Sequence, residues 1–134
     1  MVIVDTNVLA GLFIDGPFSA DARALYSEDP DWRSEPFALV EFTNVLATQI
    51  RARRLTAAAG QVLVDRAQAV FGNRLHEVDH GSVLDMAIRQ AVSAYDARFL
   101  CVALAYGSKL VTEDAALRRK APGLTRSLSQ ALGR

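Results

Sequence analysis

The sequence has a single cysteine, no excess of charge of either sign and no long apolar run. One cysteine excludes a disulfide framework within the chain, and the apolar setting of Cys101 in FLCVALAY favours a small core residue. Lys plus Arg and Asp plus Glu both number 15, so the formal net charge is zero. A neutral chain lacks a broad surface for polyanions, and any nucleic-acid contact must be local or assisted by bound cations.

Targeting segments are missing as well. The first apolar run has no basic leader and is too short for a signal peptide. No run approaches the ~20 apolar residues of a membrane span, so we expect a cytoplasmic protein. The 134 residues are 51% hydrophobic and 22% charged, which suits one globular domain over 1–134.

Helical and strand-like patterns alternate along the chain, without repeats or long linkers. Short apolar segments predict strands over 2–5 and 109–112, an alternating pattern predicts one over 74–79, and a further edge strand is predicted over 124–128. Helical patterns cover 6–14, 19–27, 36–54, 56–72, 81–92, 95–107 and 114–120, and 28–32 is predicted as a turn. This alternation predicts an α/β fold with a central parallel sheet flanked by helices. Binding sites in such sheets lie at the carboxyl ends of the strands.

Carboxylates follow several predicted strands. Asp5 follows the first strand, and Thr112 and Asp114 lie at the end of the strand near residue 110. The stretch 5–7 (DTN) would also serve as a helix N-cap, so it does not by itself indicate a site. Asp79 ends a predicted strand too, and we interpret it as the cap of the next helix.

Two further acids, Glu41 and Asp96, lie inside helical patterns without a cationic partner on the same face. The neighbours of Glu41 three and four positions away are Phe37, Ala38, Asn44 and Val45. Those of Asp96 are Val92, Ser93, Phe99 and Leu100. Such a carboxylate is costly to bury unless it is paired, hydrogen-bonded or bound to a metal. A solvated position, or for Asp96 a favourable place near a helix start, is the alternative for each acid alone.

Together, these positions supply four acids that we expect to converge on one pocket: Asp5, Glu41, Asp96 and Asp114. Oxygen-only donor sets suit hard cations such as Mg²⁺ or Mn²⁺. Metals held in this way activate water and stabilise charge on a phosphoryl group. Asn7 and Thr112 can supply neutral hydrogen bonds to metal-bound water or to the acids.

The motifs VDTNVL, LVEFTNVL, YDARFLCVALAYG and LVTEDAAL occur in this order along the chain. With them, the chain resembles the PIN-domain ribonucleases, and among these the VapC-type toxins of prokaryotic toxin–antitoxin pairs. The resemblance covers nearly the whole length and implies a single PIN domain. It also implies that the metal-binding residues are Asp5, Glu41, Asp96 and Asp114.

Three other residues take their expected roles from the same resemblance. Thr112 matches the small hydroxyl residue before the last acid, and Asn7 matches the polar residue two positions after the first. Glu113 stands where the family varies, so it is a candidate to contact the metal ligands rather than the metal.

The resemblance implies a Mg²⁺- or Mn²⁺-dependent endoribonuclease that cleaves RNA phosphodiesters. It further implies a homodimer that is held inactive by a small antitoxin with a DNA-binding end. Apolar side chains of the early helices either fill the core or form a groove for an amphipathic partner helix. These are Phe13, Phe18, Leu25 and Tyr26.

Other functions remain open at this stage. A housekeeping PIN nuclease and a PIN-like fold used only for binding share the same motifs. A haloacid-dehalogenase-like phosphatase needs a second Asp where Asn7 stands, and it leaves Glu41 unexplained. A receiver module needs an acidic pair after its first strand, and VIVDTN has one acid. The basic cluster 51–54 either complements the helix dipole or contacts an RNA backbone, and His76 and His80 are interpreted as non-ligands.

Overall fold

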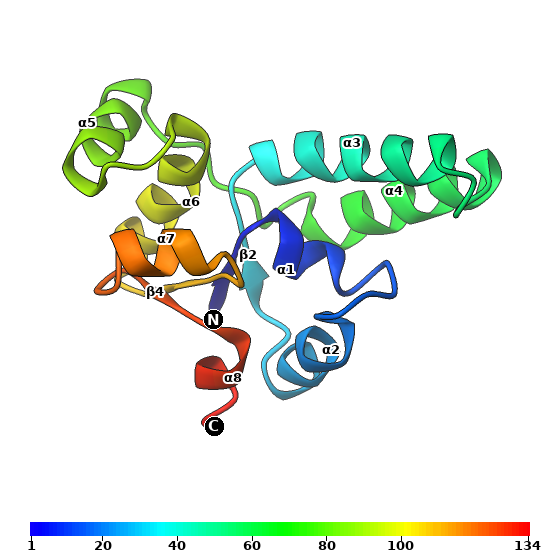
Figure 1. The fold of residues 1–134 in the computed structure, drawn as a ribbon, viewed down its shortest axis with the longest axis horizontal. Coiled ribbons are helices and arrows are strands. Elements are labelled where there is room, and N and C mark those ends of the chain that lie inside the picture. The colour runs from blue at the N-terminus through cyan, green and yellow to red at the C-terminus, as the bar shows by residue number, and fades with distance from the viewer.

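A four-stranded parallel sheet forms the centre of the computed structural model, which describes residues 1–134 (Figure 1). Its strands are β1 (Val2–Val4), β2 (Trp32–Arg33), β3 (Leu110–Val111) and β4 (Thr125–Arg126). The order across the sheet is β2-β1-β3-β4, and every neighbouring pair is parallel. Ile3 pairs with Arg33 on one side and with Leu110 on the other. The predicted α/β fold with a central parallel sheet is therefore confirmed.

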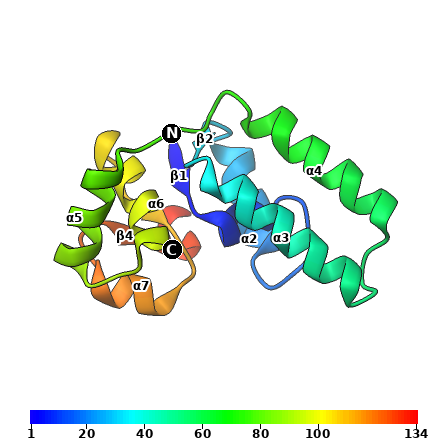
Figure 2. The ribbon, with the colours of Figure 1, turned by 90° about the horizontal axis from the view of Figure 1, so that it is seen from above.

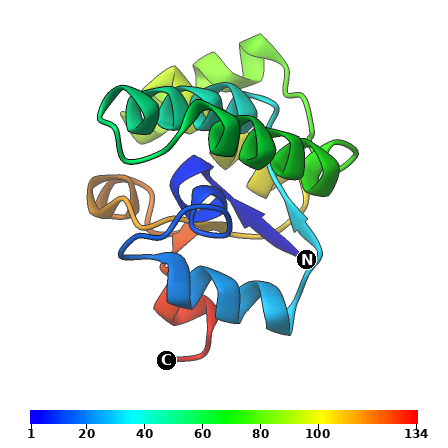
Figure 3. The ribbon, with the colours of Figure 1, turned by 90° about the vertical axis from the view of Figure 1, so that its right-hand side faces the viewer.

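Eight helices flank this sheet. They are α1 (Thr6–Ala10), α2 (Ser19–Glu28), α3 (Phe37–Arg51), α4 (Ala57–Phe71), α5 (His80–Gln90), α6 (Ala94–Ala105), α7 (Ala115–Lys120) and α8 (Leu128–Ala131). α3 and α4 pack together on one side of β1, and α5 packs on α6 on the other (Figure 2). α2 and α8 pack together on the face of the sheet opposite α3 and α4 (Figure 3).

Side-chain caps explain where most of these helices begin. Thr56 accepts from the Ala59 amide at the start of α4, and Asp79 accepts from the Ser82 amide at the start of α5. Ser93 caps α6 in the same way. The prediction that Asp79 is a helix cap is confirmed. The caps matter for the site because the capped starts of α1, α6 and α7 contribute residues to the pocket at the carboxyl edge of the sheet.

Two local predictions were wrong. Residues 74–79 do not form a strand: the segment makes one isolated bridge, between Leu75 and Ser34, before Asp79 begins α5. The strand at the edge of the sheet beside β1 is β2, and its first residue, Trp32, belongs to the segment that was predicted as a turn. Trp32 drives its formation, since its side chain is completely buried in the core. One buried aromatic residue among polar neighbours shows no alternation from which a strand can be predicted.

Several predicted helices end earlier than expected, and one was not expected at all. α1 stops at Ala10, before the end of the pattern over 6–14, and α3 stops at Arg51. Arg53 has a positive φ of 58°, which turns the chain toward α4. The edge strand predicted near the C-terminus is present as β4, and the short helix α8 follows it. No helix is both long enough and apolar enough to cross a membrane.

Candidate active site

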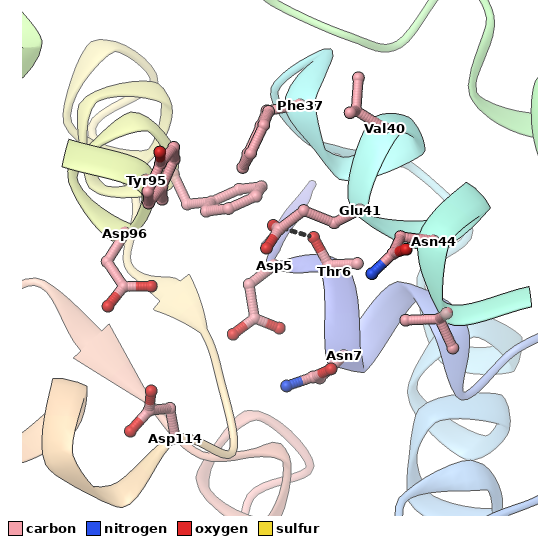
Figure 4. Close-up of a pocket in the computed structure, with 12 residues that line it drawn as sticks. Asp5, Thr6, Asn7, Phe37, Val40, Glu41, Asn44, Tyr95, Asp96 and Asp114 are labelled. Carbon is pink, nitrogen blue, oxygen red and sulfur yellow. Dashed lines mark hydrogen bonds between the residues drawn. The ribbon is translucent and has the colours of Figure 1, made fainter. Parts of the chain in front are cut away.

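A pocket of about 430 Å³ opens at the carboxyl ends of β1 and β3, between the starts of α3 and α6 (Figure 4). Four carboxylates line it, and they are Asp5, Glu41, Asp96 and Asp114. The remaining lining residues are neutral or apolar: Thr6, Asn7, Phe37, Val40, Asn44, Val45, Tyr95 and Phe99. The structure thus brings together the four acids that the sequence analysis selected, and no Lys, Arg or His lines the pocket with them.

Asp5 is held by hydrogen bonds to both of its carboxylate oxygens. Oδ1 accepts the Val8 amide at 3.1 Å and so caps α1, while Oδ2 accepts the hydroxyl of Thr112. The side chain is largely buried, with 8% of the residue exposed. The N-cap role considered for this stretch is therefore real, and it coexists with a place in the pocket because each carboxylate oxygen can accept more than one hydrogen bond.

Thr112 connects the two acids that follow the neighbouring strands β1 and β3. Its hydroxyl donates to Asp5 and accepts the amide of Asp114 at 3.1 Å. Asp114 Oδ1 in turn accepts the Leu117 amide at 3.1 Å and caps α7. Thr112 is completely buried, so this linkage is shielded from solvent. The relative position of Asp5 and Asp114 is therefore set by backbone geometry and one shared hydroxyl.

Glu41 reaches the pocket from α3 and is oriented by a residue of α1. The hydroxyl of Thr6 donates to Glu41 Oε1 at 2.7 Å, and the Thr6 side chain is buried (Figure 4). Sequence reasoning missed Thr6 because it searched for partners of Glu41 only on its own helix. A useful signal was nonetheless present, since Thr6 lies between two residues already selected, Asp5 and Asn7.

Asp96 lies in the first turn of α6, half-buried, with its carboxylate toward Asp114 (Figure 4). Its amide donates to the Ser93 hydroxyl at 3.0 Å, which anchors the helix start. Burial raises the pKa of Asp96 above its ordinary value, and the negative charge of Asp114 raises it further. Ser93 and the more distant Lys120 act in the opposite direction.

The pKa of Asp5 reflects both the burial and the charge of the pocket. The pKa of Asp5 is raised from 3.8 to about 6, and burial is the largest cause. The hydrogen bonds from Thr112 and Val8 lower this pKa, whereas the charges of Asp96 and Asp114 raise it. The charge of Asp114 therefore disfavours the ionised forms of both Asp5 and Asp96, and a bound cation would relieve that repulsion.

The other residues selected from the sequence fall into two groups. Asn7 is exposed and lines the pocket. Glu113 lies outside it: Oε1 accepts the Leu128 amide at 2.7 Å, and Oε2 lies 3.5 Å from Arg118. Glu113 thus ties the chain after β3 to α8. The histidines contact other side chains, His76 with Tyr106 and His80 with Arg98.

The donor set fits a hard, hydrated cation. All polar side-chain donors in the pocket are carboxylate, hydroxyl or amide groups, which suit Mg²⁺ or Mn²⁺. No three His, Cys, Asp or Glu side chains lie close enough together to enclose a metal ion directly. Mg²⁺ commonly keeps several of its waters and binds through one or two carboxylates, so the wider spacing suits an ion that contacts some acids through water.

Comparisons with known proteins agree with this architecture. PAE2754 from Pyrobaculum aerophilum is 22% identical, with a TM-score of 0.74 and coverage of 100% of both chains. FitAcB from Neisseria gonorrhoeae is 17% identical, with a TM-score of 0.67 and coverage of 95% of this chain and 96% of that one. At these identities the similarity shows the fold alone. A search of curated proteins returned no match.

The sequence also matches a family model over most of its length. The model describes the PIN domain, and the match spans residues 2–122. Those residues include all four carboxylates of the pocket and every strand except β4. This match favours the PIN domain over the receiver and haloacid-dehalogenase alternatives. The chain belongs to the PIN domain family.

Proposed function

We propose that this chain is a Mg²⁺- or Mn²⁺-dependent endoribonuclease, with one PIN domain spanning residues 1–134. PIN domains are generally metal-dependent nucleases. The observation that carries the proposal is the set of four carboxylates that meets at the ends of two adjacent parallel strands without a cationic side chain among the lining residues. Such a cluster is unfavourable by itself and becomes favourable when it holds a divalent cation.

In this proposal Asp5, Glu41, Asp96 and Asp114 hold the metal directly or through its waters. The bound metal supplies an activated water and stabilises the charge that develops on the phosphoryl group. The chain's own task is to keep the acids oriented. Thr112 orients Asp5 and Asp114 together, and Thr6 orients Glu41. Asn7, exposed at the same pocket, can donate its amide to a phosphate oxygen.

The test compares two adjacent acids of one loop. Purified protein is incubated with single-stranded RNA in Mg²⁺, in Mn²⁺ and in excess chelator. Asp114→Asn removes a carboxylate that lines the pocket, whereas Glu113→Gln removes one that is bound to α8. We expect Asp114→Asn to lower kcat by at least about 100-fold, as loss of a group that stabilises transition-state charge does, and Glu113→Gln to retain cleavage. Undiminished cleavage in chelator, or by Asp114→Asn, contradicts the proposal.

We further propose that the physiological role is that of a VapC-type toxin, controlled by a small antitoxin with a DNA-binding end. A groove of about 430 Å³ supports this, because it can accept an amphipathic helix. Its lining residues are Leu12, Phe13, Arg23, Tyr26, Ser27 and Val70. Two of the groove residues selected from the sequence, Phe13 and Tyr26, belong to it, whereas Leu25 is buried in the core and Phe18 lines a different pocket. A basic antitoxin side chain inserted among the acids would pair with them and displace the metal.

The same family resemblance leads us to propose a homodimer. Exposed aliphatic side chains on α5 and α6 support self-association, and they are Leu84, Ile88 and Leu104. Light scattering of the purified chain measures the mass directly. A monomer mass at micromolar concentration contradicts the dimer and leaves the nuclease proposal intact.

Expression in a bacterial host separates a toxin from a housekeeping PIN nuclease. We expect the chain alone to arrest growth, Asp114→Asn to be harmless, and co-expression of the small open reading frame beside its gene to restore growth. A chain that cleaves RNA when purified but leaves growth unaffected supports the housekeeping nuclease. A chain that binds RNA without cleaving it in any divalent metal supports a PIN fold used only for binding.

A further inference from the structure

Tyr95 is a large aromatic residue that lines the acidic pocket and is still 62% exposed. It directly precedes Asp96 in the first turn of α6. The other two tyrosines differ from it. The difference lies in exposure: Tyr26 and Tyr106 are half-buried, although each, like Tyr95, has its ring against another side chain, Tyr26 against Trp32 and Tyr106 against His76. Tyr95 thus exposes much more of its surface than packing of the fold requires.

The ring of Tyr95 is backed by a second aromatic ring at the pocket. Phe37, the first residue of α3, stacks on Tyr95 with a centroid separation of 5.3 Å and an interplanar angle of 14° (Figure 4). Phe37 covers one side of the Tyr95 ring, and the large exposed fraction leaves surface on the other side open. A nearly parallel arrangement of this kind presents a flat, oriented aromatic face to solvent.

The position of this pair relative to the acids is set by two helices. Tyr95 is adjacent to Asp96 on α6, and Phe37 lies one turn before Glu41 on α3. All four residues line the same pocket. A molecule that contacts the Tyr95 ring therefore lies in the same pocket as the carboxylates, and the aromatic pair is attached to the helix starts that carry Asp96 and Glu41.

Charge alone does not explain how this chain would bind RNA. The formal net charge is zero, and acids rather than cations line the pocket. Release of counterions from RNA phosphates, which depends on Lys and Arg contacts, can contribute little there. Stacking of unpaired bases on aromatic rings does not depend on net charge, and it is the common way in which proteins select single-stranded RNA.

We propose that Tyr95, backed by Phe37, is a stacking platform for an unpaired nucleobase next to the scissile phosphate. The inference rests on the proposed function and makes it more specific, because it assigns the contact with a base beside the cleaved bond to one exposed aromatic ring. A base in a duplex is stacked and paired on both sides, and it cannot reach the ring without being extruded.

The first test measures stacking without cleavage, in the Asp114→Asn background. Short single-stranded RNAs carry 2-aminopurine, a fluorescent base quenched by stacking, at one position at a time. We expect binding to quench the fluorescence at one position with Tyr95 or Tyr95→Phe, and not with Tyr95→Ala. Val62→Ala, an exposed apolar residue of α4 outside the pocket, is the matched control and retains the quenching. Equal quenching with Tyr95→Ala overturns the proposal.

The second test uses cleavage and abasic nucleotides. An abasic nucleotide beside the cleaved bond is expected to raise the KM of the unaltered protein by on the order of 10- to 100-fold, the range of one lost stacking contact. Tyr95→Ala should raise KM for the intact RNA by a similar factor and show no further abasic penalty, with kcat largely retained. If Tyr95 only packs the helix starts, Tyr95→Ala lowers the melting temperature and keeps the abasic penalty, which overturns the proposal.

The two tests also separate this inference from the proposed function. Absence of cleavage by the unaltered protein in either metal contradicts the nuclease, while the fluorescence measurement still decides whether Tyr95 stacks on a base. Cleavage without position-specific quenching supports the nuclease and contradicts the platform. Equal KM for paired and unpaired versions of one target sequence also contradicts it.

Discussion

The Thr6 hydroxyl and the Glu41 carboxylate, 35 positions apart, are joined by a hydrogen bond of 2.7 Å. This contact ties α1, which begins after the cap residue Asp5, to α3, and it fixes the orientation of a carboxylate that has no partner on its own helix. Because Thr6 is buried, the hydrogen bond is protected from competition with bulk water. Its role is testable by a change that keeps the volume of the side chain.

Thr6→Val should lower RNA cleavage while the protein remains folded. The substitution removes the donor to Glu41 and keeps a side chain of similar shape. A hydrogen bond to a charged group contributes about 1.5–3 kcal/mol, so loss of orientation corresponds to roughly a 10- to 100-fold lower kcat. Thr6→Ser retains the donor and should retain most activity. Steady-state cleavage assays and thermal melting measure the two effects, and equal activity of the Val and Ser variants would falsify this role.

The raised pKa of Asp5 predicts that metal-free stability falls as the pH rises. Its folded-state pKa is about 6, against 3.8 ordinarily. Between these values the folded state binds more protons than the unfolded state, so the free energy of unfolding decreases from about pH 4 to about pH 6 and then stays low. A difference of about 2 in pKa corresponds to a decrease of about 3 kcal/mol in the free energy of unfolding. The raised pKa of Asp96 changes the stability in the same direction.

Asp5→Asn provides the measurement for this pH dependence. Asparagine keeps an oxygen that can cap α1 and has no charge to bury. Urea unfolding in chelator, from about pH 4 to about pH 8, should show a smaller decrease for Asp5→Asn and greater stability than the unaltered protein above about pH 6. A decrease of equal size in both proteins means that Asp5 does not carry the effect. The same variant should not cleave RNA.

Divalent metal should stabilise the folded protein through the pocket. A ligand that binds only the folded state at about 100 times its Kd adds about 2.7 kcal/mol, which is several degrees in melting temperature for a chain of this size. We expect Mn²⁺ or Mg²⁺ to raise Tm of the unaltered protein and chelator to reverse it. Asp114→Asn should lose the response, and Asp79→Asn, at the cap of α5 outside the pocket, should keep it. A response that survives in Asp114→Asn places the metal elsewhere.

The ion pair between Glu35 and Arg98 should be essential for stability. Glu35 is only 3% exposed, its Oε1 lies 3.2 Å from Arg98, and its Oε2 accepts the Phe37 amide. Arg98→Met would leave the carboxylate buried without its cation, at an expected cost of about 3–5 kcal/mol in urea unfolding. Adding Glu35→Gln to Arg98→Met should recover much of that loss. A loss below about 1 kcal/mol would show that solvent already screens the pair.

The four carboxylates could be selected from the sequence because their placement follows local rules. Asp5 and Asp114 each follow a short apolar strand, and the carboxyl ends of parallel strands share one edge of a sheet. Glu41 and Asp96 could be selected because helical spacing shows that neither has a cationic neighbour on the same face of its helix. The fold class followed from the alternation of the two periodicities. Each of these inferences uses residues within a few positions of one another.

The tertiary structure alone decided how those acids are held and what surrounds them. Thr112 reaches Asp5 across 107 positions, and Tyr95 meets Phe37 only because α6 and α3 begin at the same edge of the sheet. The partner of Glu113 is likewise a distant amide, at the start of α8. Contacts of this kind depend on how the elements pack, which a periodic pattern does not encode. The sequence by itself therefore determined which residues carry the charge of this site. The packing of α1, α3, α6 and α7 around the sheet determined which neutral side chains orient those residues.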